Sequence, residues 1–348
     1  MSAAWRAPTR RLRPRVVLGG LALVVVVAAL VELSVGAATI DVPQHLRCLA
    51  GEATGCAAGE RYILLSLRLP RTLVAAVVGC GLAVSGAAMQ GLFRNPLADP
   101  GLIGVSSGAA LGAGVAIALE AGAELLPFGL TLPALAFAGG LAATCLVHRL
   151  AQVRGQTSVT SLLLAGIAVS ALAGAVIGLL GYIADDQQLR DLSMWLLGGL
   201  GGASGDVLLV LVPTVAIACA LLWRRARALD ALMLGEAEAF HLGVDVERLR
   251  RRVVAEVALA VGACVAFTGV IGFVGLVVPH LLRGVVGPRH RLLLPAAGLG
   301  GAALLLLADA AARTVLAPAE LPVGILTALL GAPVFLSLLA RARAAEVA

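Results

Sequence analysis

Long apolar runs separated by short polar segments dominate the chain. Ten such runs can be read between charged residues and turn signals, at 16–37, 70–93, 100–119, 132–150, 159–183, 205–223, 246–267, 270–286, 292–314 and 322–340. A helix needs about 20 apolar residues to cross a bilayer, and a backbone in lipid must satisfy its own hydrogen bonds. The pattern therefore predicts an all-α, polytopic membrane protein, with ten transmembrane helices in a single domain over residues 1–348.

The distribution of arginine predicts how these spans are oriented. All 26 basic residues are Arg, and Arg near span ends favours the cytoplasmic side. With ten spans and a cytoplasmic N-terminus, 20 Arg lie inside and 6 outside. The main alternative merges the seventh and eighth runs, which only Thr268 and Gly269 separate, and it would remove this asymmetry. We therefore predict that both termini are cytoplasmic and that residues 38–67 form the one long periplasmic loop.

Composition agrees with a membrane protein and restricts its chemistry. Apolar residues make up 60% of the chain and the mean hydropathy is +1.00, whereas soluble domains are roughly 45–50% apolar. Without Lys the chain has no P-loop, so any ATP it uses must be hydrolysed by another chain. The sequence contains neither HExxH nor CxxC. We expect no catalytic site, no resident metal or cofactor and no nucleic-acid partner.

Charged residues inside the predicted spans are candidates for function or pairing, because charge in lipid is costly. Asp309 and Arg313 are four residues apart, so they share a helix face and can neutralise each other. Glu256 lies near the cytoplasmic Arg cluster, which favours local pairing over a proton relay. An ion-coupled secondary transporter is the alternative in which Glu256 would act. Glu32 is the remaining charged residue within a predicted span.

Two polar segments leave alternatives open. The stretch from Arg224 to Arg252 predicts a short amphipathic cytoplasmic helix, which would dock on a partner or lie on lipid headgroups. Its apolar positions at helical spacing are Leu229, Leu232, Met233 and Phe240. Cys48 and Cys56 share the outer loop, where an oxidising compartment would allow a disulfide, and the sequence does not decide whether they pair.

Four blocks of sequence resemble the FecCD family, the membrane permeases of type II ABC importers for iron-siderophores, haem and vitamin B12. They are RLPRTLVAAVVGCGLAVSGAAMQGLFRNPLADPGLIGVSSGAALGA (68–113), ALMLGEAEAFHLG (231–243), GVIGFVGLVVPHLLRGVVGPRHRLLLPAAGLGGAALLLLADAAART (269–314) and ELPVGILTALLGAPVFLSLL (320–339). The blocks occur in the family's order. The resemblance implies a permease homodimer in the bacterial inner membrane, with two ABC ATPase subunits and a periplasmic substrate-binding protein as partners beside the membrane lipid.

The resemblance also implies roles for individual residues. The residues that it implies for docking of the binding protein are Arg68, Arg71 and Arg313. The residues that it implies for the cytoplasmic gate are Asn95, Leu97, Thr160 and Ser161. The segment 228–243 corresponds to the coupling helix that contacts the ATPase, with Leu234, Gly235, Glu236 and Ala239 as the contact residues.

The cargo is the least constrained prediction. Residues 185–202 resemble both haem and vitamin B12 permeases, and Arg190 lies where it could meet an anionic group such as a haem propionate. We expect haem as the cargo, moved by ATP-driven alternating access, with an iron-siderophore or cobalamin as the alternatives. No cofactor is expected to be bound permanently, and ATP is used by the partner subunit.

Overall fold

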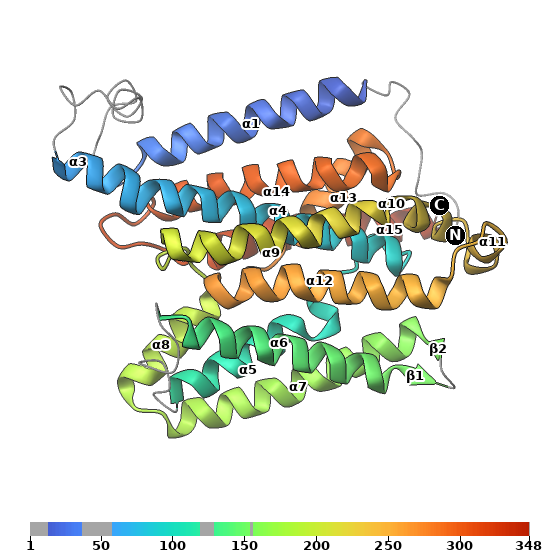
Figure 1. The fold of residues 1–348 in the computed structure, drawn as a ribbon, viewed down its shortest axis with the longest axis horizontal. Helices are drawn as coiled ribbons and strands as arrows, with labels where there is room; N and C mark the ends of the chain where they lie inside the picture. Colours follow the sequence, from blue (N-terminus) through green and yellow to red (C-terminus); the bar gives the residue numbers. More distant parts are fainter. Residues whose placement is uncertain (1–12, 37–57, 119–128, 154–155, 348) are drawn as a thin grey trace.

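The structure is a computed structural model that describes residues 13–36, 58–118, 129–153 and 156–347. In these ranges helices dominate, and most run along the long axis of the molecule (Figure 1). The helices of the first half are α1 (Pro14–Ser34), α3 (Ala58–Tyr62), η2 (Ile63–Arg68), α4 (Leu69–Leu92), η3 (Pro100–Ile103), α5 (Val105–Ala118), α6 (Thr131–Leu150) and α7 (Val159–Ile183). Those of the second half are α8 (Asp186–Leu197), α9 (Gly205–Arg224), α10 (Ala226–Leu232), α11 (Glu236–His241), α12 (Val246–Thr268), α13 (Val274–Val286), α14 (His290–Ala312) and α15 (Val323–Val347). A two-residue antiparallel ladder pairs β1 (Gln152–Val153) with β2 (Gln156–Thr157).

Each of the ten predicted apolar runs contains a helix, which confirms the all-α prediction. Six helices in the described ranges are long and apolar enough to cross a membrane, namely α1, η2 with α4, α6, α7, α9 and α14. The apolar helices α5 and α13 and the apolar part of α15 are shorter, so the count of ten crossings stays a prediction. The seventh and eighth runs form two separate helices, because α12 ends at Thr268, Gly269 has φ +68°, and α13 begins only at Val274.

The predicted outer loop 38–67 ends in helix. Residues 37–57, and with them Cys48 and Cys56, lie outside the described residues. Residues 58–68 form α3 and η2, and helical dihedral angles at Tyr62 and Leu69 carry the chain on into α4. The helix that leads into the second apolar run therefore begins before residue 70, and η2 shares one apolar candidate span with α4. That residues 38–67 lie in the periplasm stays a prediction.

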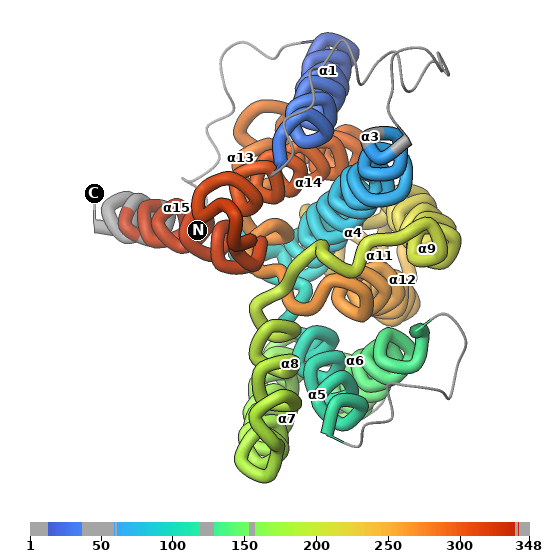
Figure 2. Tube along the Cα trace, turned by 90° about the vertical axis from the view of Figure 1, so that its left-hand side faces the viewer, coloured from blue at the N-terminus to red at the C-terminus, as the bar shows by residue number. Residues whose placement is uncertain are grey.

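Helix α4 forms the centre of the molecule and contacts α14, α9, α13 and α12 (Figure 2). In its apolar window 78% of the residues are buried, against 22% in α1. Two glycines allow this packing. A Cβ on Gly79 would clash with the carbonyl oxygen of Gly301 in α14, and a Cβ on Gly86 would clash with that of Gly275 in α13. Small residues of this kind let membrane helices approach backbone to backbone.

The remaining helices arrange around this centre. Helices α5, α6, α7 and α8 form a second group, and α12 contacts both α4 and this group (Figure 2). Helices α3 and α8 lie at one end of the long axis, which we call the α8 end. Helices α10 and α11 and the β ladder lie at the other, which we call the α11 end (Figure 1). Together the two groups form one body with two polar ends.

The contact between α4 and α13 predicts a stability effect. Gly86→Ala places a methyl group into the Gly275 backbone, and overpacking of this kind costs about 1–3 kcal/mol. Thermal unfolding of the purified protein in detergent should show a clearly lower midpoint. The matched control is Gly19→Ala in α1, where no described atom lies within 4 Å of the new methyl. An equal midpoint for the two variants would contradict the proposed packing role.

Candidate functional site

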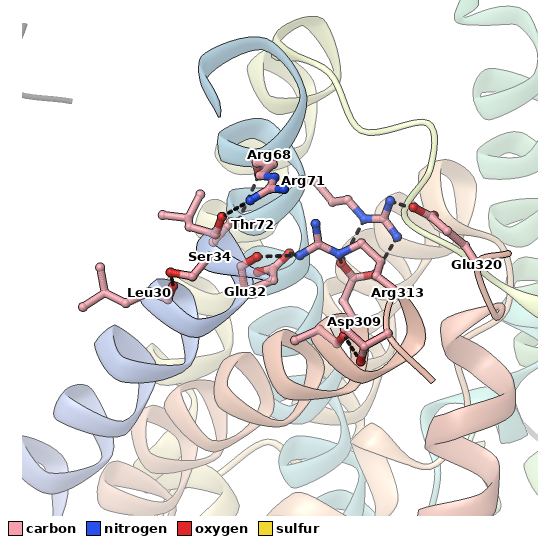
Figure 3. A network of polar contacts seen from close by, with 12 residues as sticks. Leu30, Glu32, Ser34, Arg68, Arg71, Thr72, Asp309, Arg313 and Glu320 are labelled. Atoms are coloured by element: carbon pink, nitrogen blue, oxygen red, sulfur yellow. Dashed lines mark hydrogen bonds and ion pairs between the residues drawn. The ribbon is translucent and has the colours of Figure 1, made fainter. Parts of the chain in front are cut away.

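A cluster of charged side chains joins α4, α14 and the segment before α15 at the α8 end (Figure 3). Arg71 in α4 donates from Nε and Nη2 to the two carboxylate oxygens of Asp309, at 2.9 and 3.0 Å. Its Nη1 donates to Glu320 at 2.9 Å. The Asp309 side chain is fully buried, and a bidentate guanidinium pair is the strong form of such a bond. Arg71 therefore neutralises a buried acid while it reaches a half-exposed one.

Arg313 and Arg68 attach the end of α1 to the same cluster. The Nε of Arg313 is 3.4 Å from Asp309 Oδ2, which confirms the predicted pair, and its Nη2 donates to the Glu32 carbonyl at 2.7 Å. The Nη1 of Arg68 donates to the Leu33 carbonyl at 2.7 Å. The last carbonyls of a helix lack partners in that helix and form the negative end of its dipole. Two arginines from other helices thus cap the C-terminal turn of α1.

The structure brings the three predicted docking arginines together. Arg68, Arg71 and Arg313 line one open cavity of about 340 Å³ at the α8 end. Arg68 and Arg313 are only 5% and 7% exposed, so each mainly serves the chain's own packing. Glu320 lines the same cavity and was missed from the sequence, where its place at the start of the ELPVG block was the available signal.

The predicted gate residues lie on two elements in contact, the 93–99 turn with η3 and the start of α7. Asn95 is exposed, and its Oδ1 accepts from the Leu97 N–H at 2.9 Å. Thr160 is exposed and Ser161 half-buried in the first turn of α7. In the 93–99 turn, burial raises the pKa of Asp99, and a hydrogen bond from the Gly101 N–H acts in the opposite direction. Among the described residues, no hydrogen bond joins Asn95 or Leu97 to Thr160 or Ser161.

The predicted coupling helix is two short helices. Gly235, with φ +136°, separates α10 from α11, because only glycine adopts this backbone easily. Leu229 and Leu232 are fully buried, so they belong to the core and not to a docking face. Ala239 is buried too, which corrects its prediction as a contact residue.

Three large apolar side chains of this segment are exposed, beside the exposed polar residues Glu236, Glu238 and His241. Leu234, Phe240 and Leu242 are 67%, 73% and 63% exposed, whereas Glu236 pairs with Arg250 at 2.8 Å. Phe240 had been placed on the apolar helix face, and its exposure makes it a better docking residue than Ala239. The α11 end therefore exposes three large apolar side chains among polar ones.

Glu256 is paired inside the chain. Its Oε1 accepts from Arg225 Nε at 3.2 Å, which confirms the local pairing expected from the sequence. A neutralised acid at this position is poorly suited to relay protons alone.

Two features could contact cargo. Arg190 is exposed on α8. A separate cavity of about 630 Å³, lined by α8, the 270–273 turn and α15, is almost entirely apolar. No group of three or more His, Cys, Asp or Glu within the described ranges is placed to hold a metal ion.

Comparisons with known proteins give consistent results. Residues 23–341 match the FecCD transport family. The hemin transport system permease protein HmuU of Yersinia pestis is 49% identical over 342 residues, which cover 96% of this chain and 98% of the relative. The cobalamin import permease BtuC of Halobacterium salinarum is 46% identical over 279 residues, covering 80% and 73%. A metal-chelate type ABC transporter solved in an inward-facing conformation matches with a TM-score of 0.83 and 36% identity, over 94% of this chain and all of that one.

The charge cluster predicts unequal effects of two similar substitutions. Asp309→Asn removes the buried partner of Arg71 and Arg313, and breaking a buried pair costs about 3–5 kcal/mol. Glu320→Gln removes the partner that is 51% exposed, which should cost at most about 1 kcal/mol. Thermal unfolding in detergent measures both. Equal losses of stability would show that Asp309 does not hold the cluster together.

Proposed function

Because the chain belongs to the FecCD transport family, we propose that it is the permease subunit of an ATP-driven importer that carries haem across the bacterial inner membrane. The chain is a transport subunit and not an enzyme, and ATP hydrolysis belongs to a separate ATPase subunit. The observation that carries the proposal is the match to a hemin permease over 96% of this chain and 98% of the relative.

Haem is preferred over cobalamin for two reasons. The cobalamin and vitamin B12 permeases reach 46% and 42% identity but align over only 80% and 82% of this chain. In addition, the cavity between α8 and α15 is apolar, which suits a flat hydrophobic macrocycle, and the exposed Arg190 suits its carboxylates. An iron-siderophore or cobalamin remains the alternative cargo.

The proposed assembly is a homodimer with two ATPases and one periplasmic binding protein. Helix α7 supports a lateral partner, because its window is only 22% buried and a Cβ on Gly174 or Gly178 would meet no described atom within 4 Å. The exposed Leu234, Phe240 and Leu242 make the α11 end the proposed ATPase side. The arginine-lined cavity makes the α8 end the proposed side for the binding protein. In this orientation α1 begins at the cytoplasmic side.

In the proposed mechanism ATP binding closes the ATPase pair and moves the coupling segment at the α11 end. The gate residues Asn95, Leu97, Thr160 and Ser161 then change between open and closed. Cargo enters from the binding protein at the α8 end. A secondary transporter is disfavoured, because Glu256 is already paired with Arg225.

Uptake by reconstituted vesicles tests this function. The tagged chain is purified from its native host in mild detergent with the ATPase that accompanies it, and haem-loaded binding protein is supplied outside the vesicles. We expect haem uptake that requires ATP and stops when the Walker A Lys of the ATPase is replaced. Uptake that survives this replacement and collapses with an uncoupler would establish the secondary transporter instead. Cobalamin and siderophores in the same vesicles decide the cargo.

Docking at the arginine-lined cavity predicts an effect of Glu320. Glu320→Gln makes the cavity more positive without touching the buried pairs, so an acidic binding protein should associate several-fold faster at low salt. The difference should vanish at high salt, where charges are screened. Asp206→Asn, an exposed charge change in the first turn of α9, is the control. Stopped-flow association that is the same for wild type and Glu320→Gln would count against this docking site.

A further inference from the structure

Arg250 in α12 joins three elements at the α11 end. Its side chain is only 6% exposed, and its Nη2 donates to Glu236 Oε1, the first residue of α11, at 2.8 Å. Its Nη1 donates to the carbonyl of Thr157, the last residue of β2. One guanidinium therefore bridges the coupling segment and the chain that leads into α7.

Glu247, one turn earlier in α12, holds Thr157 from the other side. Its Oε2 accepts from the Thr157 N–H at 3.0 Å, and its Oε1 accepts from the Thr157 hydroxyl at 2.7 Å. Arg250 lies 3.6 Å from the same carboxylate. The N–H, the carbonyl and the side chain of Thr157 are thus all bound by two residues of α12. Thr157 cannot move independently of that helix.

Thr157 in turn precedes the predicted gate. Ser158 is the N-cap of α7, where its Oγ accepts from the Ser161 N–H at 3.4 Å. Thr160 and Ser161 occupy the first turn of α7. A shift of Thr157 is therefore delivered to the gate residues within one helical turn.

Helix α11 has a glycine near each end. Gly235 and Gly243 flank it with φ of +136° and +80°, and glycine tolerates such angles without steric cost. An open cavity of about 1030 Å³ is lined by α11 residues together with Thr157, Glu247 and Arg250. The space next to the guanidinium gives α11 room to move.

The chemistry of arginine makes the link effective. Its planar guanidinium presents separate donors to two acceptors at once, and a buried charge that loses one partner is strongly penalised. Movement of α11 that keeps the bond to Glu236 must pull Arg250 and the first turns of α12, and Thr157 moves with them because Arg250 and Glu247 both hold it. The exposed bond between Arg248 and Asp245, with side chains 68% and 51% exposed, has no such constraint.

We propose that Arg250 is the positioning residue that transmits movement of α11 to the start of α7, through Glu236 on one side and Thr157 on the other. The inference rests on the proposed function, because α11 is moved by the ATPase only in an ABC importer. It assigns Arg250 to the coupling of ATP hydrolysis to transport and not to either activity alone.

The test measures ATP hydrolysis and haem uptake in the same vesicles, containing the full complex and haem-loaded binding protein. Arg250→Gln should lower the haem imported per ATP hydrolysed about tenfold, in line with the effect of mutations on a coupling path, while ATP hydrolysis stays within about twofold of wild type. Arg252→Gln, an exposed Arg→Gln change on the same helix, should leave the ratio unchanged. An unchanged ratio in Arg250→Gln would overturn the inference.

A second variant covers the case in which Arg250→Gln does not assemble. Glu236 is 56% exposed, so Glu236→Ala removes the carboxylate that Arg250 binds on α11 without leaving a buried cavity. This variant should also lower the haem imported per ATP hydrolysed. A fall in hydrolysis and uptake together, with the ratio unchanged, would mean lost ATPase contact and would overturn the inference. If wild-type vesicles show no ATP-dependent uptake, the proposed function itself fails. If wild type and both variants import the same amount of haem per ATP hydrolysed, only this inference is overturned.

Discussion

The backbone contacts of α4 are the constraint on which the rest of the structure depends. Gly79 and Gly86 allow α4 to lie against Gly301 in α14 and Gly275 in α13. A helix held this closely transfers displacement to its neighbours, because close-packed interiors deform little. The N-terminal turn of α4 carries Arg71, and its C-terminal end leads directly into the turn with Asn95. The two ends of the molecule are therefore connected through one rigid helix.

Arginine side chains bridge separate elements at both ends of the molecule. Arg71 bridges Asp309 and Glu320, Arg313 bridges Asp309 and the Glu32 carbonyl, and Arg250 bridges Glu236 and Thr157. Each guanidinium contacts two acceptors from different elements, which the single ammonium of Lys does less well. A chain whose basic residues are all Arg can thus attach its loops and helix ends by side-chain bridges. Arg313 in addition binds a carbonyl in the last turn of α1, where carbonyls lack partners within the helix.

The arginine clusters at the α8 end and the α11 end differ in how much movement they allow. At the α8 end the arginines cap α1 and hold a fully buried Asp309, an arrangement that resists movement. At the α11 end the bridge spans a short helix with a glycine at each side and a large open cavity. One end of the molecule is thus fixed by buried ion pairs, whereas the bridge at the other end lies beside glycines and open space. In the proposed importer the fixed end would receive the binding protein and the other end the ATPase.

The sequence by itself determined the helices and the local pairing. Apolar runs predict helices wherever the backbone must satisfy its own hydrogen bonds, and Asp309 with Arg313 follows from a spacing of four. It did not reveal that residues 58–68 are helical or that Ala239 is buried, because neither the extent of a helix nor burial can be read from local hydrophobicity. Arg71 meets Asp309 across 238 residues, and Arg250 meets Thr157 across 93. Only tertiary structure decided these bridges, since which charges meet depends on how helices pack and not on their order along the chain.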